Sequence, residues 1–103
     1  MDGYTFAIHE KDLTNGMMKT IQVGNNKIAL ANIDGQIFAI DDRCSHKECS
    51  LGTEGALDGN VVICGCHGAK FDMSSGEVMS LPAVTNVRSY AVKIENGDVL
   101  VKV

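Results

Sequence analysis

The chain has little positive charge and no long hydrophobic run. It holds 9 lysines and arginines against 13 aspartates and glutamates, for a formal net charge of −4, and no basic run stands out among its 103 residues. Nucleic acids and anionic membranes attract dense positive charge, so neither is expected as a partner. No window approaches the roughly 18 apolar residues of a membrane-spanning helix. We therefore expect no membrane association.

The first residues also lack the basic start and apolar stretch of a secretory leader. From this we expect a cytoplasmic, unanchored protein. Internal repeats and low-complexity segments are absent as well. A hydrophobic content of 45% and a charged content of 21% are ordinary for globular chains. At this length we expect a single domain over residues 1–103.

Short runs of alternating hydrophobicity dominate the sequence. Apolar runs at 27–33 and 36–40 are joined by Asp34-Gly35, and Asn96-Gly97 separates similar runs near the end of the chain. Such dipeptides are strong hairpin signals, because both central residues of a type I′ turn need a positive φ. The pattern predicts an all-β domain of short antiparallel strands. The expected strands include 4–9, with Tyr4, Phe6 and Ile8 on one face, and 17–23, paired to 27–33 across a turn at 24–26. Further strands are expected at 90–95 and 98–103, and one helical turn within 10–16.

The segment 41–59 interrupts this pattern. It is polar and glycine-rich, contains cysteines and shows no strand period, whereas 60–64 resembles a strand and 65–68 a turn. Long segments without periodicity in a compact domain are usually functional. We expect the central region to be inserted into the β scaffold and to carry the function.

All four cysteines lie between positions 44 and 66, close to two of the three histidines. Cys44-Ser45-His46 is a Cys-x-His pair, and Cys64-Gly65-Cys66-His67 contains a Cys-x-x-His pair. A secreted disulfide scaffold would spread its cysteines along the chain, so the clustering indicates a metal site. His9 has no cysteine nearby, and we expect an ordinary surface histidine there.

Two kinds of metal centre use two thiolates and two imidazoles. A tetrahedral zinc site is one, but zinc fingers usually place the cysteine pair first and the histidine pair later, on a helix. Here each motif supplies one ligand of each type. This division suits a two-iron cluster with both thiolates on one iron and both imidazoles on the other, as in Rieske centres. A structural zinc module stays as the alternative.

The sequence resembles Rieske proteins, which pair Cys-x-His with Cys-x-x-His across a spacer of similar length. The likeness extends to Gly68 after the second histidine, to Phe71, and to the turn at Ser75-Gly76. Leu81-Pro82-Ala83 is similar to the proline loop that covers the cluster in that family. The resemblance runs from about residue 4 to residue 103.

This resemblance implies a Rieske-like fold. Its base would be a small antiparallel β-sandwich or barrel formed by residues 1–42 and 83–103, approximately. The cluster-binding subdomain, at about 43–82, would be inserted in that base and would present two loops.

The resemblance also implies one Rieske-type [2Fe–2S] cluster. Its ligands would be Cys44 and Cys64 on the inner iron and His46 and His67 on the outer iron. Neutral imidazoles leave the oxidised centre less negative than four thiolates would, which makes reduction easier. Gly68, Ala69, Phe71 and Pro82 would lie around the cluster.

Two further features concern respiratory Rieske subunits. Cysteines at the positions of Cys49 and Cys66 form a disulfide there, so the resemblance implies the same pairing here, with two separate thiols as the alternative. Those subunits also carry Ser and Tyr where this chain has Ala69 and Phe71, and their hydroxyls donate hydrogen bonds to sulfur. Since Ala69 and Phe71 cannot donate, we expect a lower reduction potential.

The function implied by the resemblance is that of a soluble Rieske-type ferredoxin. It would be a monomer and an electron carrier rather than an enzyme, taking one electron from a reductase and passing it to an acceptor such as an oxygenase. The alternatives are an accessory Rieske-fold subunit of a reductase complex, which typically lacks the ligands, and the zinc module. The mildly acidic surface would suit a basic redox partner, although most acidic proteins are merely soluble.

Overall fold

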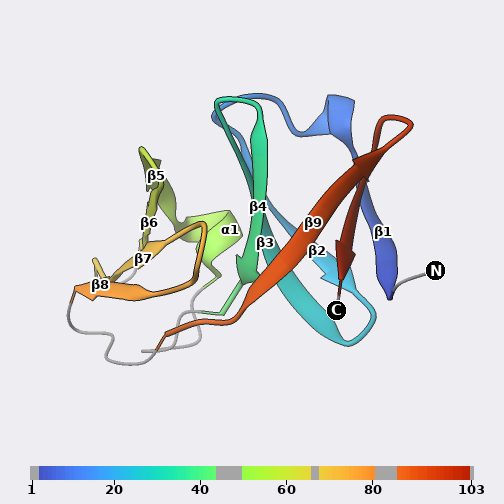
Figure 1. Ribbon diagram of the computed structural model, residues 1–103. Helices are drawn as coiled ribbons and strands as arrows, with labels where there is room; N and C mark the ends of the chain where they lie inside the picture. The colour runs from blue at the N-terminus through green and yellow to red at the C-terminus, as the bar shows by residue number, and fades with distance from the viewer. Residues whose placement is uncertain (1–2, 44–49, 66–67, 81–85, 103) are drawn as a thin grey trace.

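The computed structural model describes residues 3–43, 50–65, 68–80 and 86–102. Within them the chain forms two antiparallel sheets (Figure 1). One sheet has the strand order β1-β10-β9-β4-β3-β2, and the other has the order β5-β6-β7-β8. The elements are β1 (Tyr4–His9), η1 (Glu10–Asp12), β2 (Met18–Val23), β3 (Asn26–Ile33), β4 (Gln36–Asp41), α1 (Leu51–Glu54), β5 (Ala56–Asp58), β6 (Val61–Ile63), β7 (Lys70–Asp72), β8 (Val78–Ser80), β9 (Ser89–Glu95) and β10 (Asp98–Lys102).

Both predicted two-residue hairpins are confirmed. Asp34 and Gly35 have φ values of 55° and 89°, and Asn96 and Gly97 have values of 51° and 82°. The flanking residues pair directly, Ile33 with Gln36 at the first turn. Asp and Asn are the non-glycine residues that best tolerate the left-handed region, which is why these dipeptides close the turns. The helical turn expected within 10–16 is also present, as the 3-10 helix η1.

Two local expectations need correction. Val23 pairs with Asn26, so the turn between β2 and β3 has two residues rather than the three predicted. In β1 the register shifts between Phe6 and Ile8, and Phe6 is 48% exposed while Ile8 is buried. A bulge moves the following residues to the opposite face, so the expected alternation of Tyr4, Phe6 and Ile8 is wrong.

The central region contains more regular structure than its sequence indicated. The helix α1 and the strand β5 lie within 41–59, where no periodicity was found. Strands β7 and β8, of three residues each, follow the second motif. Such short strands have too few residues for a visible period and form by pairing with β6 and with each other.

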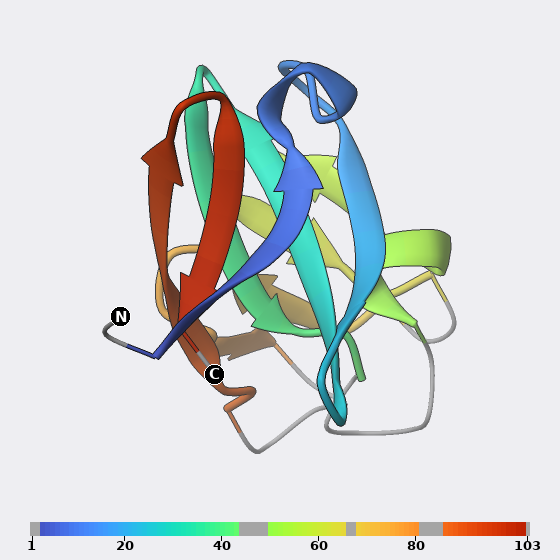
Figure 2. The ribbon, with the colours of Figure 1, turned by 90° about the vertical axis from the view of Figure 1, so that its right-hand side faces the viewer.

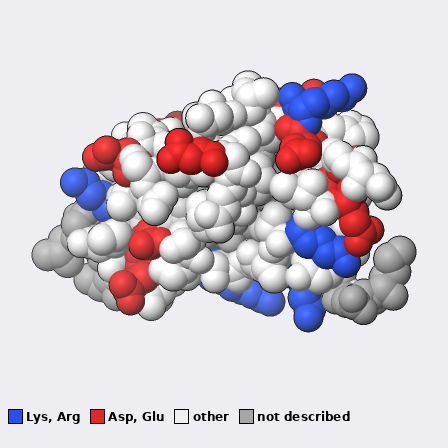
Figure 3. Space-filling model, turned by 45° about the horizontal axis from the view of Figure 1, so that its top comes forward, with Lys and Arg blue, Asp and Glu red and all other residues white. Residues whose placement is uncertain are grey.

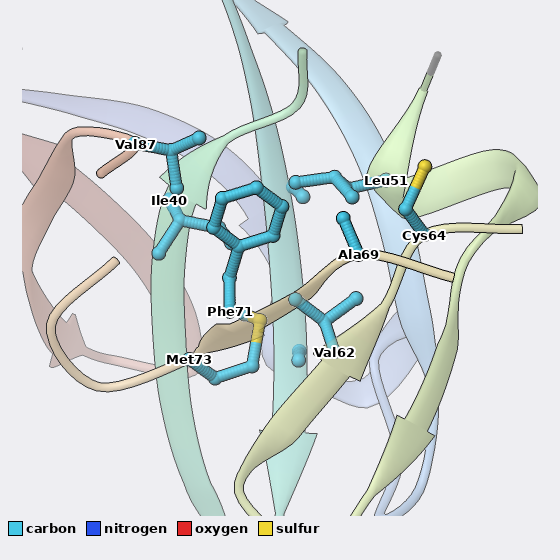
Figure 4. Close-up of a cluster of buried hydrophobic side chains, with 10 residues drawn as sticks. Ile40, Leu51, Val62, Cys64, Ala69, Phe71, Met73 and Val87 are labelled. Carbon is cyan, nitrogen blue, oxygen red and sulfur yellow. The ribbon is translucent and has the colours of Figure 1, made fainter. Parts of the chain in front are cut away.

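The six-stranded sheet curls on itself (Figure 2), and its concave side holds one core. A second core lies between this sheet and the four-stranded sheet (Figure 4). Strand β3 serves both: Ile28 and Leu30 belong to the first core, and Ala29 and Ala31 to the second. Burial on both faces explains why β3 is an almost continuous apolar run. In the part of the chain described here, no helix is long and apolar enough to cross a membrane.

Candidate metal centre

The first ligand motif follows directly from the end of β4. Arg43 and Ser50 form an antiparallel bridge, and the Leu51 N–H donates a 2.6 Å hydrogen bond to the Asp42 carbonyl. The chain therefore leaves β4 and returns to the same point before α1 begins. Cys44, His46 and Cys49 lie between these anchors and outside the described residues.

The second motif begins at Cys64, whose side chain is buried in the core between the two sheets. The Cys64 N–H donates to the Ala69 carbonyl at 2.7 Å, and the Gly68 N–H donates to the Cys64 carbonyl at 2.9 Å. Gly68 has a φ of 75°, a conformation that glycine adopts without strain. These bonds reverse the chain within a few residues. Cys66 and His67 fall between the bonded residues and outside the described ones.

The second loop is in direct contact with helix α1, which follows the first loop. A Cβ atom on Gly65 would lie 1.8 Å from the carbonyl oxygen of Glu54, so only glycine fits here. Leu51, which ends the first loop, packs in the same buried cluster as Cys64 and Ala69 (Figure 4). Thus the structure brings together the bases of two loops that are separate in the sequence. Both motifs are visible in the sequence, whereas the close approach of Gly65 to Glu54 is not.

A network of polar side chains connects the two ends of the first loop to the larger sheet. Asp42 is only 2% exposed. Its Oδ1 accepts hydrogen bonds from the Thr20 hydroxyl at 2.7 Å and from the Gly52 N–H at 2.8 Å. The Thr20 hydroxyl also lies 3.0 Å from the hydroxyls of Ser50 and Thr53. This network links β2 to both ends of the loop, and no sequence motif pointed to it.

A third segment reaches the same region through the turn between β7 and β8. The Val87 N–H donates to the Gly76 carbonyl at 2.8 Å, and a Cβ on Gly76 would lie 2.1 Å from the Val87 carbonyl oxygen. Gly76 has a φ of 77°, which confirms the turn expected at Ser75-Gly76. Pro82, predicted to cover the cluster, lies outside the described residues.

The described residues fit a Rieske cluster. Cys64 forms no disulfide and presents a buried thiol among apolar neighbours. Ala69 and Phe71, both completely buried, belong to the same cluster and are the predicted neighbours of the centre. No group of three metal-ligating side chains occurs within the described ranges, which contain only one of the four predicted ligands. Thiolate and imidazole are the donor set of a Rieske centre.

His9 takes no part in this arrangement. Its side chain is 56% exposed and its Nδ1 lies 2.9 Å from Oδ1 of Asp98, at the paired ends of β1 and β10. The ring also makes an edge contact with Phe6. The expectation of a surface histidine is confirmed.

The described residues define a small protein of two antiparallel sheets in which the buried Cys64 lies in the core between them. Comparisons with known proteins agree. The family model described as Rieske [2Fe-2S] domain matches residues 3–91. The biphenyl dioxygenase ferredoxin subunit of Pseudomonas sp. (strain KKS102) is 42% identical over 98 residues, covering 95% of this chain and 90% of that protein.

Solved structures of ferredoxins are also similar to this chain. The Sphingomonas yanoikuyae B1 ferredoxin superposes with a TM-score of 0.90 at 27% identity, over 96% of this chain and 97% of that one. A chain from the complex of reduced oxygenase and oxidised ferredoxin in carbazole 1,9a-dioxygenase gives a TM-score of 0.89 at 28% identity, over 99% and 94%.

The chain belongs to the Rieske [2Fe-2S] domain family. It is a Rieske-type ferredoxin, an electron carrier without catalytic activity of its own, and its cofactor is one Rieske-type [2Fe–2S] cluster. The predicted fold class, cofactor and function are therefore confirmed, and the alternatives of a zinc module and an accessory subunit are not supported.

Proposed function

We propose that Cys44, His46, Cys64 and His67 hold the cluster. The contact between Gly65 and Glu54 carries this proposal, because it joins the second loop to helix α1, which begins where the first loop ends. The buried thiol of Cys64 adds support, and all four positions fall within residues 3–91, the part that matches the family model. Cys44 and Cys64 would bind the inner iron, and His46 and His67 the outer iron.

The bound cluster supplies reversible uptake of one electron. The protein's part would be to hold the cluster and to keep water from it, and the apolar cluster of Cys64, Leu51 and Ala69 would serve to exclude water. A drier surrounding with few hydrogen-bond donors stabilises the more negative, reduced state less.

The ligand assignment is tested by iron and sulfide analysis of the purified protein together with electron paramagnetic resonance after reduction. In the wild type we expect two irons and two sulfides per chain and a Rieske-type signal. In Cys64→Ser and His67→Ala we expect the loss of the iron and sulfide and of the signal. Circular dichroism checks that each variant is folded, because a serine hydroxyl in the apolar surroundings of Cys64 costs stability. An unchanged signal in Cys64→Ser would contradict the assignment, and His9→Ala is the matched control that should load fully.

We propose further that this ferredoxin works in the cytoplasm as a monomer and passes its electron from a reductase to the terminal oxygenase of an aromatic-ring dioxygenase. The names of its relatives support this acceptor, since they include a biphenyl dioxygenase ferredoxin subunit and a ferredoxin in complex with an oxygenase. On the face in Figure 3 acidic and basic side chains are interspersed.

The acceptor is tested by replacing the ferredoxin of a purified biphenyl dioxygenase system with this chain. We expect oxygenase turnover that depends on the reductase, the oxygenase and the loaded ferredoxin. The Cys64→Ser protein should support none. A loaded protein that the reductase reduces but the oxygenase fails to oxidise would contradict the acceptor while leaving the ligand assignment intact.

The pairing of Cys49 with Cys66 is also a proposal. Each lies on a different ligand loop, and the contact at Gly65, next to Cys66, supports the closeness of those loops. A bond between them would restrain the unfolded chain and hold the loops around the cluster. Mass spectrometry after alkylation without reductant tests it: we expect these two cysteines to stay unmodified, whereas free thiols would both take the label.

Finally, we propose the division into a base, at about 1–42 and 83–103, and an inserted cluster-binding part at about 43–82. The sheet topology supports this division, because all four strands of the smaller sheet fall within 43–82 and all six strands of the larger sheet fall outside it. Deleting 43–82 and joining the flanks with a short linker should leave a β protein that binds no iron and is less stable than the full chain, because the deletion exposes Ala29, Ala31 and Ile40.

A further inference from the structure

The chain contains two Asn-Gly dipeptides, Asn15-Gly16 and Asn96-Gly97. Asparagine is chemically labile, because the backbone nitrogen that follows it can attack its side-chain amide carbon. Glycine favours this attack, since it has no side chain beside the attacking nitrogen. Both dipeptides are exposed, their glycines have φ values of 85° and 82°, and nothing lies within 4 Å of a Cβ at either glycine. Exposure and local conformation therefore do not distinguish the two sites.

Hydrogen bonds distinguish them. At the first site the Gly16 N–H donates to the Asn32 carbonyl at 2.8 Å, and Oδ1 of Asn15 accepts from the Asp34 N–H at 2.8 Å. Both reacting groups are thus fixed to the end of β3 and the turn that follows it. The Gly16 nitrogen must break its hydrogen bond before it can attack, which slows the reaction.

At the second site neither reacting group is held. Among the described contacts, the Asn96 side chain and the Gly97 N–H have no hydrogen-bond partner. The two residues border an open groove together with His9, Glu10 and Lys11, so water reaches them. The attack requires the turn to rotate out of its hairpin conformation, and exposed loop tips open at low cost.

We propose that Asn96 is a self-modification site of this protein, at which a succinimide forms and opens to aspartate or isoaspartate, whereas Asn15 is protected. The Gly97 nitrogen bonds to Cγ of Asn96 and loses its proton to water, and the Cγ–Nδ2 bond breaks with release of ammonia. Water then opens the ring. Opening at the side-chain carbonyl gives aspartate, and opening at the main-chain carbonyl gives isoaspartate. This chemistry is independent of the cluster.

Isoaspartate does not fit this turn. The main chain then runs through the former side chain and gains one backbone carbon, in a two-residue turn whose flanking residues Glu95 and Asp98 pair directly. The Gly97 carbonyl, which accepts from the Glu10 N–H at 2.8 Å, would be displaced from its contact with η1. Conversion should therefore weaken the hairpin of β9 and β10 and its junction with the end of β1.

Peptide mass spectrometry of the loaded protein tests the proposal. Cleavage after lysine yields peptides 12–19 and 94–102, each with one asparagine. During incubation at mildly alkaline pH, peptide 94–102 should gain about 1 Da and become a substrate of isoaspartate methyltransferase. Since hydrogen bonds hold both reacting groups at Asn15, that residue should convert at least roughly tenfold more slowly. In urea, where these bonds are lost, the two peptides should convert at similar rates.

Asn96→Gly is the matched control. Glycine accepts the positive φ of this turn and carries no side-chain amide. Its peptide 94–102 should keep its mass throughout the incubation. The thermal unfolding midpoint of this variant should also stay constant, whereas that of the wild type should fall as Asn96 converts.

Two results would overturn the modification site. One is equal conversion of the two peptides in the folded protein, and the other is an unchanged 94–102 in the folded protein while urea converts it. A fully converted wild type that keeps its unfolding midpoint would overturn the effect on the turn.

Discussion

The Tyr90 hydroxyl donates a 2.5 Å hydrogen bond to Oδ1 of Asp41, between the start of β9 and the end of β4. The other carboxylate oxygen accepts from the Arg88 N–H at 3.3 Å, and the Asp41 N–H donates to the Arg88 carbonyl at 2.8 Å. Strands β4 and β9 share only two residue pairs, so these contacts reinforce the junction that joins the halves of the larger sheet. The first ligand motif begins three residues after Asp41, which makes this junction the support of the first loop.

Tyr90→Phe should lower the free energy of unfolding by about 1–2 kcal/mol, the usual cost of losing a hydrogen bond to a charged acceptor that water can partly replace. Urea unfolding of the loaded protein measures this loss. Tyr4→Phe is the matched control, since Tyr4 has no such bond among the described contacts and should change stability little. Equal effects of the two substitutions would contradict a specific role for the Tyr90 hydroxyl.

The same tyrosine should make the folded protein less stable at strongly alkaline pH. Burial, the hydrogen bond to Asp41 and the negative charge of Asp41 together raise the pKa of Tyr90 from 10.0 to about 12, and the positive charge of Arg88 offsets only part of this. Between these values the unfolded chain releases a proton that the folded chain keeps, so stability falls as pH rises from 10 towards 12. Unfolding across this range should show a steeper decline for the wild type than for Tyr90→Phe. Parallel declines would refute the assignment.

Gly65→Ala should push the second loop away from helix α1. The new methyl group would lie 1.8 Å from the Glu54 carbonyl oxygen, a backbone atom that cannot move aside as a flexible side chain could. We expect reduced iron and sulfide content and a lower midpoint of thermal unfolding. Gly24→Asn is the control, because nothing lies within 4 Å of a Cβ there and asparagine tolerates a φ of 61°. Full cluster content in Gly65→Ala would argue against close loop contact.

Adding hydroxyl donors beside the cluster should raise the reduction potential. Ala69 and Phe71 are completely buried in the same core as Cys64. Ala69→Ser and Phe71→Tyr introduce groups that can donate to cluster or ligand sulfur and thereby stabilise the reduced state. Redox titration should show a higher midpoint for each.

Ala31→Ser is the control for these hydroxyls. It places the same group in the same core, but on β3 rather than beside Cys64. Its midpoint should match the wild type. A rise of similar size in Ala31→Ser would mean that core polarity, not a directed hydrogen bond, sets the potential.

Much of this protein could be predicted from local sequence. The turns at Asp34-Gly35 and Asn96-Gly97 depend on residues that tolerate positive φ, which is a property of the residues themselves. The two Cys/His motifs are recognisable because ligand chemistry needs particular side chains at particular spacings. The bulge at Ala7 was not predictable in this way, since it depends on how β1 fits against β10.

By itself, the sequence determined the all-β class, the hairpin turns and the set of candidate ligands, because each follows from the conformational or chemical preferences of nearby residues. The tertiary structure alone decided that Gly65 contacts Glu54, that Thr20 reaches Asp42, and that Tyr90 reaches Asp41. These contacts join residues 11 to 49 positions apart. Contacts of that kind are fixed by how strands and loops distant in the sequence pack together, and no local pattern records them.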